Sequence, residues 1–151
     1  MIINNKELAT RIRFGFMIAV LFYLAILVLS FVLNWDEAHR FPLYWSLLFF
    51  IGMVFFFLKG YNYIFFSPDG SKIILRYMPL QPFLYGTYSI EIPKQEFIKY
   101  KVKTTNFGLR TSIILYQQTD RGLSKYRPIS LASLKKSERR DMLEILNRLA
   151  R

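Results

Sequence analysis

The sequence predicts a pair of membrane-spanning helices followed by a small α+β domain. Two uncharged apolar runs, residues 14–33 and 41–58, open the chain. Beyond them the apolar residues alternate as in strands, and near the C-terminus they return to helical spacing. Strand patterns followed by one helix are typical of an α+β domain. We therefore divide the chain into a lead-in and helical hairpin, residues 1–61, and a cytoplasmic domain, residues 62–151.

The two apolar runs have the length that a membrane span requires. As a helix, the first run would extend roughly 30 Å, the thickness of the hydrocarbon core of a bilayer. It is longer than the apolar region of a secretory signal, about 7–15 residues, and no small-residue cleavage pattern follows it. Only residues 34–40 separate the runs. The chain is therefore expected to cross the membrane and return at once.

The distribution of charge predicts the orientation of this hairpin. From residue 59 onward the chain has nine lysines and eight arginines against seven acidic residues, and the segment before the first run is also basic. Lys and Arg next to spans favour the cytoplasmic side. We expect both termini in the cytoplasm and the protein in the inner (plasma) membrane of a bacterium. The expected juxtamembrane anchors are Arg11, Arg13, Lys59, Trp35 and Trp45.

The domain is expected to contain about six strands and a closing helix. Turn residues at 68–71, 106–108 and 119–122 separate the apolar runs. The helix has an apolar stripe that includes Met142, Leu146 and Leu149, with Ser133 or Ser137 as its N-cap. It would cover a bent antiparallel sheet. The expected strands are residues 63–67, 72–78, 85–92, 97–103, 111–117 and 126–131.

Lysines alternate with apolar residues along the strand expected at 97–103. Ile98, Tyr100 and Val102 would face the core, and the lysines would form a cationic face. A basic surface held near a membrane suits anionic lipids or an acidic partner protein, and it also serves orientation and solubility alone. The residues expected on this surface are Lys99, Lys101, Lys103, Arg110, Arg121, Lys125 and Arg127.

Little in the sequence indicates catalysis, a cofactor or a metal. The chain has no cysteine, and its one histidine, His39, lies in the short loop between the apolar runs. Glu91 and Glu96 are close in sequence, which is weak evidence for acid–base chemistry. Neither apolar run contains an ionisable residue of the kind that marks transport pathways. Gly15 and Ala19 form one small-residue pair that favours close helix packing.

Several stretches resemble bacterial membrane proteins that carry two transmembrane helices and a PH-like domain. The stretches are Ile90-Glu91-Ile92-Pro93 before Phe97-Ile98, Gly108 before Ser112-Ile113-Ile114-Leu115, and Pro128-Ile129-Ser130-Leu131 leading into a charged and then leucine-rich helix. The resemblance implies a PH-like barrel with a capping helix that serves binding or assembly. The basic signature of phosphoinositide-binding PH domains is reduced here to Lys72 and Arg76.

These observations favour a non-enzymatic interaction or scaffold protein that is an accessory subunit of a larger membrane assembly. Its partner would be another membrane protein or a second copy of the chain. An anionic-lipid sensor that uses the basic sheet face is the alternative, and a small enzyme or transport component is a further possibility. Nucleic acid is not an expected partner, because the chain lacks a recognisable nucleic-acid-binding motif.

Overall fold

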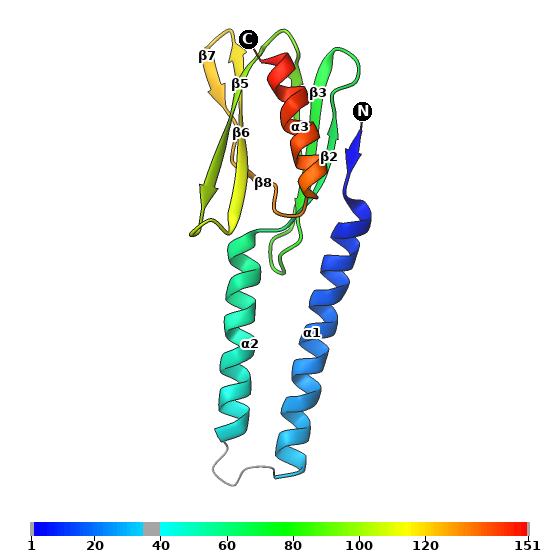
Figure 1. Ribbon diagram of the computed structural model, residues 1–151, viewed down its shortest axis with the longest axis vertical. Coiled ribbons are helices and arrows are strands. Elements are labelled where there is room, and N and C mark those ends of the chain that lie inside the picture. The colour runs from blue at the N-terminus through cyan, green and yellow to red at the C-terminus, as the bar shows by residue number, and fades with distance from the viewer. Residues whose placement is uncertain (1, 35–39, 151) are drawn as a thin grey trace.

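The computed structural model of the protein describes residues 2–34 and 40–150. Two long helices lie at one end of the molecule, and two sheets with a third helix lie at the other (Figure 1). Both termini lie at the sheet end. Trp35 and His39 lie outside the described residues. The elements are β1 (Ile3–Asn4), α1 (Lys6–Val32), α2 (Arg40–Lys59), β2 (Asn62–Ser67), β3 (Lys72–Pro79), β4 (Tyr88–Pro93), β5 (Phe97–Thr105), β6 (Arg110–Thr119), β7 (Gly122–Lys125), β8 (Ile129–Ser130) and α3 (Lys136–Leu149).

Helices α1 and α2 are both long and apolar enough to cross a membrane. A core helix of a soluble protein would be mostly covered, yet only 6% of the apolar window of each helix is buried. Helix α1 starts at Lys6, well before the apolar run. Its residues 6–13 lie alongside the sheets. Gly60, at φ +59°, ends α2 in the left-handed conformation that glycine favours.

The strands form two antiparallel sheets that do not close into a barrel. The first sheet has the order β1-β2-β3-β4; the second has the order β5-β6-β7, with β8 also paired to β6. In the described part of the chain no ladder joins the two sheets. Strand β7 pairs with residues 116–119 of β6, and β8 with residues 112–113, so both use the same edge of β6. The barrel expectation is therefore wrong.

A single core lies between the sheets and α3. Ile64 and Phe66 from β2, and Ile113 and Leu115 from β6, are fully buried. Met142 is also fully buried, as is Leu146, which confirms that the predicted stripe of α3 faces the core. This helix packs on the domain and nowhere extends along the helix pair (Figure 1).

Several predicted boundaries are wrong in detail. Strand β4 begins at Tyr88 and not at residue 85. The strand expected at 126–131 is reduced to β8, and β7 was not predicted. Lys135, and neither predicted serine, precedes α3 as its N-cap. Val102, which we expected to face the core, is 40% exposed on the edge strand β5. Phe97, which we did not assign to the core, is fully buried.

Strand β1 was not predicted, and it changes where the domain begins. Ile3 pairs with Phe66 and Asn4 with Phe65, so the segment before α1 forms an edge of the first sheet. Ile3 is 3% exposed and belongs to the core. The sheet domain therefore includes chain from both sides of the helix pair, and residues 62–151 alone would lack one of its strands.

Four buried polar side chains join the two helices to the domain; we call them the polar junction. They are Asn5, before α1, Asn62, after α2, and Ser130 and Ser133, before α3. The Asn5 side chain donates to Ser133 Oγ at 2.9 Å and to Asn62 O at 3.2 Å, and it accepts from Ile64 N at 2.7 Å. Asn62 donates to Ser130 O at 3.2 Å. The junction thus links three segments that are far apart in the sequence.

The last turn of α2 is held by side chains from three other segments. Helix ends leave backbone carbonyls without intrahelical partners. Gln81 donates to Phe57 O at 2.8 Å, Asn106 to Leu58 O at 2.8 Å, and Ser130 to Lys59 O at 3.1 Å. These bonds fix the end of α2 against the β3–β4 loop, the β5–β6 turn and β8.

We predict that Asn5→Ala destabilises the chain by about 3 kcal/mol, because a buried group left without its partner costs about 1–3 kcal/mol. Asn147→Ala, an exposed change on α3, should cost less than about 0.5 kcal/mol. Guanidinium unfolding of the full chain in mild detergent, followed by circular dichroism, measures both. Equal values for the two variants would show that the polar junction does not stabilise the fold.

Candidate functional site

The outer face of the second sheet gathers lysines from two strands; we call it the lysine face. Lys99, Lys101 and Lys103 alternate along β5, so their side chains share one side of the sheet. Lys99 is opposite Tyr116 of β6, which is itself opposite Lys125 of β7. Lys99 Nζ lies 5.5 Å from the centre of the Tyr116 ring. The lysine face is therefore Lys99, Lys101, Lys103 and Lys125, with Tyr116 between Lys99 and Lys125.

The lysine face is a concentration of positive charge. All four lysines are exposed, and in the described residues none forms an ion pair with a carboxylate. Two of these charges about 7 Å apart would repel by roughly 0.6 kcal/mol in water before salt screening. The lysine face therefore carries exposed positive charge that no carboxylate of the described residues neutralises in an ion pair.

Strand β5 runs along the long axis of the molecule toward the end of α2 (Figure 1). The turn that follows it touches α2, since Asn106 bonds to Leu58 O. Lys103 is therefore nearest to the helix pair and Lys99 farthest from it. At about 3.3 Å per residue, the two lysines are separated by roughly 13 Å along this axis.

The three arginines predicted for the basic surface lie apart from one another. A Cβ placed on Gly60 would lie 3.1 Å from the Arg110 guanidinium, so Arg110 is at the end of α2. Its Nε is buried without a hydrogen-bond partner. Arg121 is in the turn between β6 and β7 at the far end of the sheet. Arg127 is close enough to Tyr77 of the first sheet to influence its ionisation.

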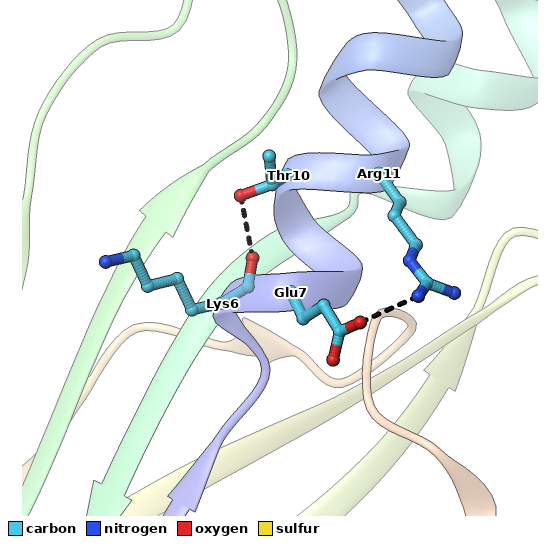
Figure 2. A network of polar contacts seen from close by, with 4 residues as sticks. All are labelled: Lys6, Glu7, Thr10 and Arg11. Atoms are coloured by element: carbon cyan, nitrogen blue, oxygen red, sulfur yellow. Dashed lines mark hydrogen bonds and ion pairs between the residues drawn. The ribbon is translucent and has the colours of Figure 1, made fainter.

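The predicted juxtamembrane anchors have different surroundings. Arg11 Nη2 lies 2.7 Å from Glu7 Oε1, one turn earlier in α1 (Figure 2). Arg13 has no acidic partner in the described part of the chain. Lys59 lies over the Tyr61 ring at 5.8 Å, and Trp45 Nε1 donates to Tyr23 O at 3.4 Å. Trp35 lies outside the described residues.

Helices α1 and α2 meet through aromatic side chains and leave a groove beside them. Phe16 packs on Phe56, and Tyr23 stacks on Phe49 with ring centres 4.1 Å apart. The Tyr23 hydroxyl also lies 2.9 Å from Ser46 Oγ. The groove has a volume of about 650 Å³, and its lining includes Gly15, Ala19 and Gly52. A Cβ added at Gly15 or Gly52 would meet no atom within 4 Å.

The small residues therefore do not bring the two helices of this chain into close contact at these positions. Gly15 and Ala19 are exposed on α1. The open space beside them is wide enough for side chains or acyl chains from another molecule. Together, the lysine face and this groove are the two candidate interaction surfaces.

The described residues contain no group of three or more His, Cys, Asp or Glu side chains that could hold a metal ion. No protein-family model, curated protein or solved structure matches the chain. The geometry of the chain itself is therefore the evidence for its function.

The ionisation of two tyrosine side chains, Tyr77 and Tyr126, should affect the stability of the domain at alkaline pH. Burial raises the pKa of Tyr77, with a further increase from Tyr88 and an opposing effect of Arg127. Burial, and then Glu96, raises the pKa of Tyr126. In the unfolded chain both phenols ionise near pH 10. The folded state keeps its protons to higher pH, so this contribution to stability is present below about pH 10 and is lost as the pH rises through the folded pKa values.

We predict that the double variant Tyr77→Phe and Tyr126→Phe loses less stability than the parent chain between about pH 9 and pH 11. Denaturant unfolding at several pH values, together with the ultraviolet absorbance of phenolate, measures the effect. An equally steep decline in parent and variant would show that other groups control the alkaline response.

Proposed function

We propose that the chain is a non-enzymatic accessory subunit of a membrane assembly. In this proposal α1 and α2 anchor it in the inner membrane of a bacterium, and a PH-like domain faces the cytoplasm. Two antiparallel sheets followed by a C-terminal helix support the PH-like assignment. The basic character of both the lead-in and the domain supports the orientation, since Lys and Arg favour the cytoplasmic side of spans.

The direction of the lysine face is the observation that carries this proposal. When α1 and α2 span a bilayer, β5 points toward the membrane and does not lie parallel to it (Figure 1). Lys99 is then roughly 13 Å farther from the membrane than Lys103, which exceeds the Debye length of about 8 Å at physiological salt. Anionic headgroups would therefore attract Lys103 much more than Lys99. An acidic protein surface beside the domain can contact the whole lysine face.

The rigid connection between helices and domain adds to this argument. The polar junction and the three bonds to the last turn of α2 hold the lysine face in one direction relative to the helix axes. A partner that binds both the groove and the lysine face would meet two surfaces at a fixed spacing. Such preorganisation lowers the entropy lost on binding. This arrangement suits a subunit that holds a partner in place.

Lysines on an edge strand also discourage pairing between sheets of different molecules. A charge reversal separates this role from partner binding, since glutamate protects an edge strand as well as lysine does. Partner binding through the lysine face would be lost on reversal, whereas edge protection would be kept.

We predict that the triple variant Lys99→Glu, Lys101→Glu and Lys103→Glu recovers on the order of tenfold less of its membrane partner than the parent chain, because favourable charge pairs become repulsive. The measurement is quantitative mass spectrometry of proteins that copurify with the tagged full chain in mild detergent. The triple variant Arg76→Glu, Lys136→Glu and Arg140→Glu has the same net charge change on β3 and α3, away from the lysine face, and should keep the partner. Undiminished recovery with the first variant would contradict the assignment of this face.

We predict that Gly15→Leu also releases the partner, because the added side chain fills part of the groove. It should leave the helix pair intact, since no atom of the chain lies within 4 Å of the added Cβ. Val28→Leu changes an exposed position outside the groove lining and serves as the control. Copurification shows whether the partner is lost, and unfolding in detergent verifies the fold. A Gly15→Leu chain that keeps every partner would exclude the groove as the contact.

A further inference from the structure

A cleft lies between the start of α1 and the segment that follows β3. It consists of two adjoining cavities, of about 250 Å³ and about 320 Å³, which both reach Arg13, Met78 and Leu80. Phe16, Met17 and Leu84 line the first cavity only. Lys6 and Thr10 line the second cavity only. The cleft is therefore apolar at one end and polar with two cations toward the other.

The two cations of the cleft share one stripe of α1. Lys6, Thr10 and Arg13 are spaced by four and three residues, which places them on one face of a helix. Glu7 and Arg11 form their ion pair on a different side, away from Lys6 and Thr10 (Figure 2). Glu7 is the one acidic residue described in the first turns of α1, and it is paired with Arg11. In the described residues neither Lys6 nor Arg13 has an acidic partner.

The position of the cleft along α1 sets its depth. Arg13 immediately precedes the uncharged run that begins at Phe14. Met17 lies four residues beyond Arg13, or about 6 Å further along the helix. Arg13 is thus at the boundary of the span, Lys6 lies about 10 Å before it along the helix, and the apolar part of the cleft is just inside. This change from cationic to apolar over one helical turn matches a phospholipid headgroup joined to its acyl chains.

The β3–β4 loop forms the second wall of the cleft and is held at this depth. Gln81 ties the loop to the last turn of α2 through its bond to Phe57 O at 2.8 Å. Leu84 and Tyr85 line the cleft, and the neighbouring Phe83 is 81% exposed at φ +71°. Exposed aromatic rings at this level are typical of the membrane interface. The wall is therefore placed where lipids would be present.

We propose that this cleft binds one anionic phospholipid from the leaflet that faces the sheet domain. Arg13 and Lys6 would contact the phosphate, and Phe16, Met17 and Leu84 would contact the first part of an acyl chain. The two unpaired cations favour a headgroup with net negative charge over a zwitterionic one. This proposal rests on membrane anchoring through α1 and α2, and it is independent of any partner of the lysine face.

The test is native mass spectrometry of the full chain in detergent with equal amounts of phosphatidylglycerol and phosphatidylcholine. We expect one phosphatidylglycerol to be retained in preference to phosphatidylcholine. Arg13→Gln and Lys6→Gln should each reduce this retention about tenfold, because each removes a charge-assisted contact. Arg11→Gln is the matched control and should leave retention unchanged. Leu84→Ser, in the other wall, should also reduce retention.

Three results would overturn the proposal. Equal loss with Arg11→Gln and Arg13→Gln would show that overall charge, and not the cleft, attracts the lipid. Equal retention of phosphatidylcholine would show that the cations have no role. Displacement of the lipid by millimolar glycerol phosphate would indicate a site for free phosphate. A chain that fractionates away from membranes would instead contradict the proposed anchoring, so the two failures are distinguishable.

Discussion

Buried polar groups are stable only when they are hydrogen-bonded, and an unmet partner costs about 1–3 kcal/mol. The buried polar side chains of the polar junction lie where both long helices enter the domain, so their hydrogen bonds must be kept there. The Asn5 side chain accepts a hydrogen bond from Ile64 N and donates one to Asn62 O. The Asn62 side chain donates to Ser130 O, in the segment before α3. A rotation of either helix against the sheets would break several of these bonds at once. The direction of the domain relative to the helix axes depends on this set of contacts.

That direction decides what each charged group can reach. The lysine face runs along the axis, so only its lower end is near the helix pair, and its charge is available to a neighbour at the side of the domain. The two unpaired cations of α1 line a cleft beside the β3–β4 loop: Arg13 is at the start of the apolar run, and Lys6 lies about 10 Å before it along the helix. The molecule therefore has two separate cationic surfaces, at different distances from the span. The net charge of the domain alone does not show that these cations form two separate surfaces.

Strand β1 shows why residues 62–151 are not the whole domain. Its two residues precede α1, yet they pair with β2 and bury Ile3 in the core. A two-residue strand has too little periodicity to be recognised from sequence. Strands β7 and β8 were difficult to predict for the same reason, since both are short. They share one edge of β6. Asn5 directly before a helix is a familiar N-cap position, but its partners lie far along the chain.

The sequence by itself determined the two long apolar helices, the main strands β2, β3, β5 and β6, and the apolar stripe of α3. These features follow from local spacing and composition, which act along neighbouring residues. Only the tertiary structure decided that the sheets stay open, that Arg110 lies at the end of α2 while Arg121 lies in the turn between β6 and β7, and that Lys6 and Arg13 line a cleft with the β3–β4 loop. Each of these depends on contacts between distant segments, where hydrogen bonding and packing select one arrangement from many that the local pattern permits.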